Sequence, residues 1–185
     1  MAQAKRKQKF LDVEMPILKK ETQLYGYDFK DIDKRTITYD LTRLLRGKGT
    51  ILKLKVKIKE NKAIADPIEL KILPYFIRRM MRKGVNYVED SFSIQCKDAL
   101  LRIKPFLITR KKVSRAVRKA LREKTKEELT EYVKNQEAET LFDEIIKNKI
   151  QKFLSLKLKK IYPLSLCEIR FFALENQKTD DLSKE

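Results

Sequence analysis

Within the segment from Thr50 to Lys59, hydrophobic and lysine residues alternate strictly from Leu52 onward, which is the clearest pattern in the chain. Because successive side chains of a strand point to opposite faces, this segment is predicted to be a strand with one hydrocarbon face and one lysine face. Its lysines, called the lysine ladder below, are Lys53, Lys55, Lys57 and Lys59. Turn residues at 60–62 lead into a second strand at 64–72, so a hairpin is expected. Pro67 cannot donate a ladder hydrogen bond and is expected at an edge or a bulge.

Shorter alternating segments predict further strands. They are expected at 10–15, 36–41, 85–96, 99–109 and 164–174. Pro16 ends the first of them, and Pro105 is expected to interrupt the strand that contains it. Residues 17–33 mix apolar and charged positions, so they are expected to be irregular or to hold one short strand.

A helical period of about 3.6 residues appears first at 73–83. Pro74 suits the first turn of that helix, and Gly84 suits the residue just past its end. One face is apolar, and the other carries only cations.

The second helical region runs from Val113 to about 161. The segment 125–128 reads Thr-Lys-Glu-Glu and matches a capping box, so a basic helix at 113–124 and one or two further helices at 126–160 are expected. The core-facing positions of the last part are Leu141, Phe142, Ile145, Ile146, Ile150, Phe153 and Leu154.

Strands come first, helices follow, and one strand closes the chain. This order predicts an α+β fold with a mainly antiparallel, β-barrel-like core and flanking helices concentrated in the C-terminal half. With 42% hydrophobic residues and only 4 Gly and 5 Pro in 185 residues, the chain has the composition of a folded protein. A single domain is expected at 10–174, after a basic flexible arm at 1–9 and before a disordered tail at 175–185.

The absence of histidine removes the commonest general base and transition-metal ligand, which argues against an enzyme and against a metal or cofactor site. Composition alone leaves a lysine or carboxylate mechanism open. Cys96 and Cys167 lack CxxC spacing, which argues against a disulfide framework or a zinc site and favours small buried residues. The apolar runs are too short for a membrane helix, and no secretory signal is recognised. A cytoplasmic protein without a membrane partner is therefore expected.

The net charge of +18 points to a polyanion, and nucleic acid is the first candidate. From Arg115 the cations follow helical spacing, and arginine can bind phosphate bidentately. The expected RNA-binding residues are Lys5, Arg6, Lys7, Lys9, Lys53, Lys55, Lys57, Arg78, Arg79, Arg82, Lys83, Arg110, Lys111, Lys112, Arg115, Arg118, Lys119 and Arg122. The alternatives are a solvated helix face and, for the ladder, a guard against edge aggregation.

Exposed aromatic residues would stack on unpaired bases, although core packing is the alternative for each. The candidates are Phe10, Tyr25, Tyr27, Phe29 and Tyr87. Residues 46–50 read Arg-Gly-Lys-Gly-Thr but lack the spacing of a phosphate loop, so an ordinary turn is expected there. No pair of acidic residues suggests metal-dependent phosphodiester chemistry.

Several segments resemble the archaeal and eukaryotic small-subunit ribosomal proteins known as the S-one-e, or S-three-a-e, family. They are Phe10-Leu11-Asp12-Val13 with Pro16, the 103–112 strand with its basic end, the Arg/Lys helix that follows, and Lys160-Ile161-Tyr162-Pro163-Leu164. The resemblance covers about 8–174 and is closest to an archaeal member, because the longer extensions of eukaryotic members are lacking.

The resemblance implies a structural ribosomal protein that binds small-subunit rRNA on the platform near the mRNA exit and has no catalytic residues. Neighbouring small-subunit proteins, mRNA and initiation components are the further partners that it implies. From the residues alone, a DNA-binding or chromatin protein and an RNA-processing factor remain alternatives.

Overall fold

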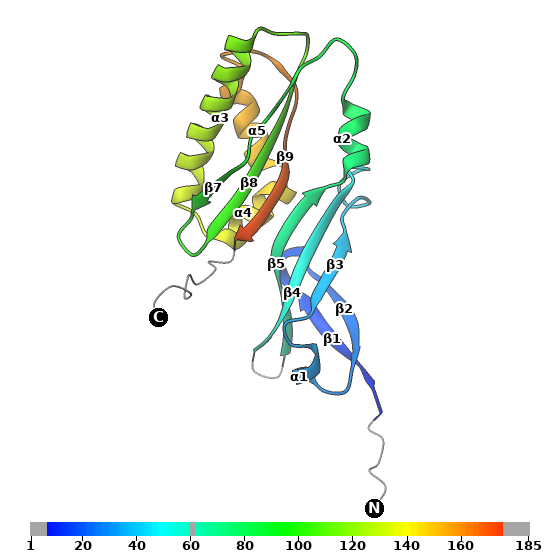
Figure 1. The fold of residues 1–185 in the computed structure, drawn as a ribbon. Helices are drawn as coiled ribbons and strands as arrows, with labels where there is room; N and C mark the ends of the chain where they lie inside the picture. Colours follow the sequence, from blue (N-terminus) through cyan, green and yellow to red (C-terminus); the bar gives the residue numbers. More distant parts are fainter. Residues whose placement is uncertain (1–6, 60–61, 176–185) are drawn as a thin grey trace, which may run out of the picture.

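The structure is a computed structural model that describes residues 7–59 and 62–175. Its strands form two groups that meet at β5, and most helices lie beside the second group (Figure 1). The strands of the first group are β1 (Lys9–Met15), β2 (Lys20–Gly26), β3 (Thr36–Asp40), β4 (Thr50–Lys59) and β5 (Lys62–Ile72). The second group comprises β6 (Tyr87–Glu89), β7 (Phe92–Gln95), β8 (Leu100–Thr109) and β9 (Leu164–Glu175). The helices are η1 (Pro16–Leu18), α1 (Phe29–Ile32), α2 (Pro74–Met80), α3 (Arg115–Lys134), α4 (Ala138–Ile146) and α5 (Lys149–Leu158).

The sheet branches at β5. One edge of β5 pairs with β4, while its other edge is shared by β1 near Ala63 and by β9 near Leu70. Apart from the short parallel contact of β1 with β5, all ladders among the described residues are antiparallel. The α+β class and the mainly antiparallel sheet are thus confirmed.

The expected barrel-like closure is not found, because the nine-stranded sheet of the described residues is open. β2 and β3 stay at separate edges, and the ammonium group of Lys20 on β2 donates a hydrogen bond to the hydroxyl of Tyr39 on β3 at 2.9 Å. The divergence of β1 and β9 from the same edge of β5 spreads the strands into two groups instead of closing them.

Two hydrophobic clusters lie on opposite faces of β8. Leu101, Ile103 and Leu107 belong to the large cluster with α3, α4 and α5, whereas Phe106 and Ile108 belong to a small cluster with α2. Side chains of a strand alternate between faces, so a strand covered on both sides reads as a continuous apolar run. The two-sided burial explains why Pro105 to Thr109 are all buried.

The predicted hairpin of β4 and β5 is confirmed. The register shifts between Lys53, which faces Glu69, and Leu54, which faces Pro67, so Pro67 lies beside a bulge as expected. Pro105 also lies at a register shift, but it does not interrupt β8, which runs without a break from Leu100 to Thr109.

The helix boundary predicted at Thr125 is wrong, because α3 is a single helix of 20 residues. The Thr125 side chain is buried and its hydroxyl donates to the carbonyl of Leu121 at 2.6 Å, one turn back. A threonine that bonds in this way satisfies its hydroxyl inside the helix, so the capping-box pattern does not begin a helix here.

Other boundaries differ from the expectation. The segment expected as one strand at 85–96 is divided into β6 and β7, and α2 already ends at Met80. Residues 17–33 hold the strand β2 between η1 and α1, which confirms the short strand that was one of the two expectations for this segment. Lys9 begins β1, so it is part of the sheet and not of an arm. Glu175 is the last residue of β9; its carboxylate accepts hydrogen bonds from Arg102 and Ser93.

Candidate nucleic-acid interface

The cationic segment at 110–122 crosses from the end of β8 into the first turns of α3. Ser114 caps the helix, with its hydroxyl accepting a hydrogen bond from the Val117 amide at 3.4 Å. Arg110, Lys111, Lys112, Arg115, Lys119 and Arg122 are exposed, and Arg118 is half-buried. Leu121 is fully buried on the opposite side of α3, whereas Ala116, expected to face the core, is exposed.

Electrostatics at the start of α3 is unfavourable without an anion. The first turn of α3 has no acidic residue, so the partial positive charge of the helix N-terminus adds to the cations of 110–119. Beyond Arg122 the helix carries both signs: Lys119 approaches Glu123 at 3.7 Å, and Lys124 pairs with Glu127 and Glu128. The purely cationic surface therefore ends within the first two turns of α3.

The second cationic segment is Arg78 to Lys83. All four cations are exposed, but only Arg78 and Arg79 lie on α2, because the backbone turns extended at Met81. The predicted single helical stripe of four cations is therefore wrong in detail. The Arg79 guanidinium lies 5.7 Å from the ring centre of Phe76, which places this cation over an aromatic face.

Asn86 joins the two cationic segments. Its side-chain oxygen accepts a hydrogen bond from the Val113 amide at 2.8 Å, and its backbone amide donates to the Thr109 hydroxyl at 3.0 Å. The same hydroxyl donates to the carbonyl of Lys111 at 2.7 Å. The turn after α2 and the turn before α3 are thereby fixed to each other.

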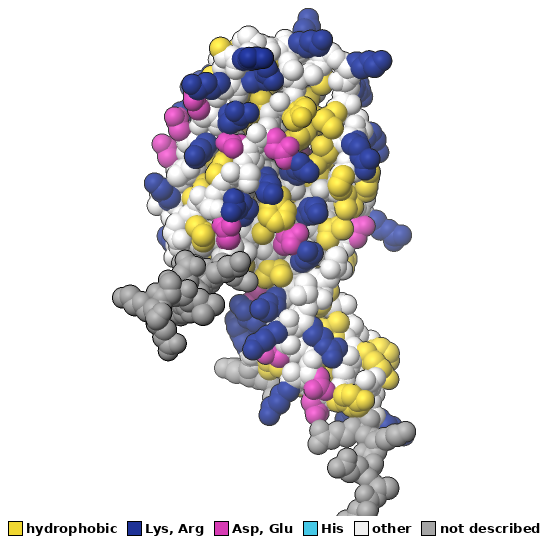
Figure 2. Space-filling model, viewed as in Figure 1, with side chains coloured by type: hydrophobic (Ala, Val, Ile, Leu, Met, Phe, Trp, Pro, Cys, Tyr) yellow, Lys and Arg dark blue, Asp and Glu magenta, His cyan; other side chains and the backbone are white. Residues whose placement is uncertain are grey.

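The two turns lie at the same end of the molecule (Figure 1). Lys and Arg side chains gather over that end in Figure 2. We call it the basic end, and its residues are Arg78, Arg79, Arg82, Lys83, Arg110, Lys111, Lys112, Arg115, Arg118, Lys119 and Arg122. The structure thus brings together eleven of the expected RNA-binding residues.

The lysine ladder lies in the first group of strands, and its charge is partly neutralised. Lys53 pairs with Glu69 at 2.8 Å, and Lys57 pairs with Asp66 at 2.8 Å, both acids being on the neighbouring strand β5. Sequence reasoning missed these pairs although the signal was present, since both acids fall in the returning strand of the predicted hairpin. Opposite charges across a ladder stabilise a hairpin without any polyanion.

At the N-terminus, Lys7 and Lys9 are exposed, while Lys5 and Arg6 lie outside the described residues. Phe10 and Tyr25 face each other across β1 and β2 with ring centres 5.1 Å apart, and they are 68% and 52% exposed. Tyr27 and Tyr87 are also exposed, whereas Phe29 packs partly against the core. Exposure leaves four of the five aromatic candidates accessible for stacking.

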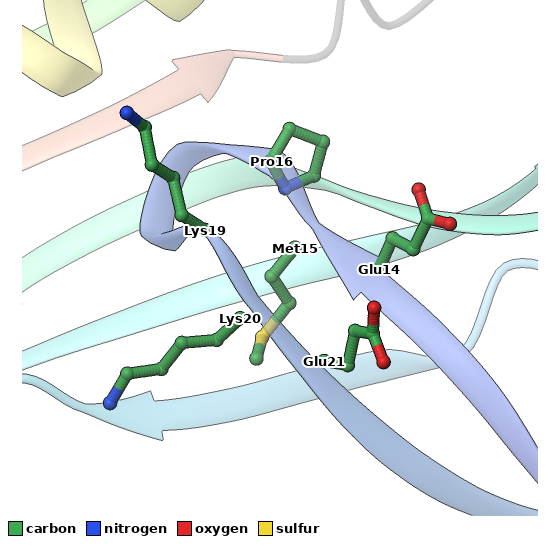
Figure 3. Close-up of a pocket in the computed structure, with 6 residues that line it drawn as sticks. All are labelled: Glu14, Met15, Pro16, Lys19, Lys20 and Glu21. Carbon is green, nitrogen blue, oxygen red and sulfur yellow. The ribbon is translucent and has the colours of Figure 1, made fainter.

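A hollow of about 350 Å³ lies at the turn between β1 and β2. The carboxylates of Glu14 and Glu21 lie together on one side of it, while the side chains of Lys19 and Lys20 extend in the other direction (Figure 3). Because both signs of charge line this hollow, it has no preference for a polyanion.

Both cysteines are buried, as expected. Burial raises the pKa of the Cys167 thiol to about 12, and the nearby Glu168 carboxylate adds to the shift. Cys96 is buried near the end of β7, with its thiol donating to the carbonyl of Ala99 at 2.9 Å. Within the described ranges there is no group of three or more His, Cys, Asp or Glu that would hold a metal ion. Of the described helices, none combines the length and apolar character needed to cross a membrane.

An α+β protein with a net charge of +18 and a cluster of exposed cations at one end has the features typical of proteins that bind polyanions. Comparison with known families makes this specific: the chain belongs to the ribosomal S3Ae family, whose model matches residues 14–177. The family consists of structural ribosomal proteins and not of enzymes, so the chain is a ribosomal protein that acts in translation on cytoplasmic ribosomes.

Three archaeal relatives share the description small ribosomal subunit protein eS1. The protein of Halorubrum lacusprofundi is 27% identical over 156 residues, which cover 82% of this chain and 73% of the relative. The protein of Nanoarchaeum equitans is 31% identical over 120 residues, or 64% of this chain and 61% of the relative. The protein of Haloarcula marismortui is 26% identical over 148 residues, or 79% and 70% of the two chains. The resemblance to an archaeal member is thereby confirmed.

Proposed function

We propose that the chain is a structural constituent of the small ribosomal subunit and binds rRNA mainly through the basic end. Family membership supports the ribosomal role. The observation that carries the rRNA contact is the junction at Asn86, which holds two arginine-rich segments together as one surface. The small-subunit platform near the mRNA exit is the proposed location, as expected from the resemblance, with neighbouring ribosomal proteins, mRNA and initiation components as partners.

Phosphate is the proposed ligand of the basic end. Backbone amides at the start of α3, other than the one capped by Ser114, are available to anions, and the arginines offer bidentate donors. An RNA strand along this end would offset the repulsion among cations that have no acidic neighbour in the first turn of α3. The lysine ladder has a supporting role, because two of its lysines are already paired with acids.

The test is the salt dependence of rRNA binding. Replacing Arg115, Arg118 and Arg122 together by alanine should weaken binding and reduce the logarithmic salt slope by about 2 to 3, since each lost phosphate contact changes it by roughly 0.7 to 0.9. The matched control replaces Lys147, Lys149 and Lys152, which removes the same charge from α5 and the turn before it.

An equal loss in both triple variants would mean that only net charge matters, which contradicts a localised interface. The intact chain should also co-sediment with small subunits in high salt. Finding it mainly on DNA would contradict the ribosomal role of the basic end.

A further inference from the structure

A hollow of about 290 Å³ lies between α2 and the strands β6 and β8. Its apolar wall includes Ile77 and Met81 from the α2 side and Tyr87 and Phe106 from the strands. Hydrophobic side chains are visible between α2 and the sheet in the upper right of Figure 2. The hollow is at the small end of the range of ligand sites, which suits a single flat ring.

The aromatic part of this hollow is open to solvent. Tyr87 stacks on Phe106 with ring centres 5.9 Å apart and an angle of 25° between the ring planes. Phe106 is only 2% exposed, whereas Tyr87 is 56% exposed and Met81 is 39% exposed. A buried ring therefore supports an accessible one, and this fixes the orientation of the accessible ring before any ligand arrives.

The charges around the hollow favour an anionic ligand. Arg78 lines it, and the exposed Arg79, Arg82 and Lys83 belong to the same segment. The acid that lines it is Glu89, whose carboxylate accepts a hydrogen bond from the Arg170 guanidinium and is neutralised by it. An apolar site that suits a flat ring, beside exposed cations, matches a nucleotide, which combines a flat base with a phosphate.

We propose that this hollow binds one unpaired nucleobase of RNA, stacked against Tyr87, while a flanking phosphate contacts Arg78. The proposal rests on the proposed rRNA-binding function and adds a different kind of contact to it. The hollow adjoins the basic end, because Arg78 lines the hollow and belongs to the basic end. Single-stranded or bulged RNA would therefore lie on the α2 side of the basic end, and the phosphate backbone would lie along α3.

The probe for this site is a short single-stranded RNA that contains one 2-aminopurine, whose fluorescence falls when the base stacks on an aromatic ring. The full chain should quench it. Tyr87→Ala should abolish the quenching and weaken binding roughly 5- to 150-fold, the range for loss of one base–aromatic stack. Tyr87→Phe keeps the ring and should behave like the unmodified chain.

Three further measurements test whether stacking at the hollow, and not misfolding, explains the effect of Tyr87→Ala. Met81→Gln removes apolar surface at the accessible edge of the hollow while Tyr87 stays, and it should reduce quenching as well. Leu156→Ala removes an exposed apolar side chain of α5, outside the stacking candidates, and should leave the binding at this hollow unchanged. Binding of a perfectly paired RNA duplex should be the same for Tyr87→Ala and the unmodified chain.

The outcomes distinguish this proposal from the one on which it rests. If Tyr87→Ala binds the probe normally while the Arg115, Arg118 and Arg122 triple variant is weakened, the base site is refuted and the basic end stands. If neither variant is weakened, both are refuted. If Tyr87→Ala instead abolishes self-association seen by sedimentation, the hollow is a contact between two copies, and the base site is again refuted.

Discussion

The hydrogen bond from the Val113 amide to the Asn86 side chain offers a direct perturbation of the basic end. At 2.8 Å it joins the turn after α2 to the turn before α3. Asn86→Ala removes the acceptor but keeps the backbone contacts of residue 86 with Thr109. A hydrogen bond of this type contributes about 0.5 to 1.5 kcal/mol, so hydrogen exchange at the Val113 amide should accelerate about 2- to 12-fold.

Binding of rRNA should weaken in the same variant, because the turn before α3 is then held less firmly against the turn after α2, although the backbone contacts with Thr109 remain. Asn86→Asp is the matched control for exchange: it keeps an acceptor for the Val113 amide, so protection should persist, while its negative charge should weaken RNA binding. Hydrogen exchange with mass spectrometry and a filter-binding assay measure the two effects. Unchanged exchange and unchanged affinity in Asn86→Ala would refute the role of Asn86 as the junction.

Three further predictions concern the remaining charges and the buried thiol. Replacing Lys53 and Lys57 together by alanine should change the salt slope of RNA binding by much less than the roughly 1.4 to 1.8 expected for two lost phosphate contacts, since both lysines are paired with acids; a full change would contradict this. In the unmodified protein the ammonium group of Lys48 lies 2.5 Å from the largely buried carboxylate of Glu168. Lys48→Met leaves that carboxylate without its cation, so it should lower the free energy of unfolding in urea by about 3 kcal/mol. Adding Glu168→Gln should restore much of the loss, and no recovery would argue against the charge as its cause. The pKa of Cys167 is raised to about 12 in the folded protein from an ordinary value of 9.0. The unfolded chain therefore loses the thiol proton first as the pH rises, so the contribution of this thiol to stability is present below about pH 9 and is lost between pH 9 and 12. Cys167→Ala should flatten this alkaline decline in stability, measured by thermal unfolding.

Much of the fold was predictable because its strands alternate in sequence. The hairpin of β4 and β5 and the bulge at Pro67 follow from side-chain direction and from the missing N–H of proline. The open sheet was not predictable, because β5 shares one edge between β1 and β9, and both pairings join segments far apart in sequence, as Val13 with Ala63 and Leu70 with Phe172 show. No local pattern encodes that choice of partner.

The helical errors have local physical causes. Thr125 matched a capping box, yet its hydroxyl bonds within the helix, and Glu128 is buried beside Lys124 and Lys157. A capping pattern defines a helix start only where the preceding residues leave the helix, and here they continue it. Burial of Glu128 with two cations depends on α5, which sequence reasoning cannot place.

The candidate site was predictable in its residues but not in its assembly. Helical spacing identified the cations of 110–122, and the structure adds that Asn86 brings 78–83 to the same end. Asn86 carries no charge and no motif, so only its contacts reveal it. The lysine ladder was overvalued, because its balancing acids lie on the neighbouring strand.

Cross-linking in the assembled particle tests the central claim most directly. Small subunits that contain this chain would be irradiated with ultraviolet light, and the peptides joined to rRNA would be identified by mass spectrometry. Cross-links should concentrate in peptides that contain 78–87 and 110–122. Cross-links confined to the lysine ladder and the first group of strands, with none at the basic end, would contradict the proposed interface.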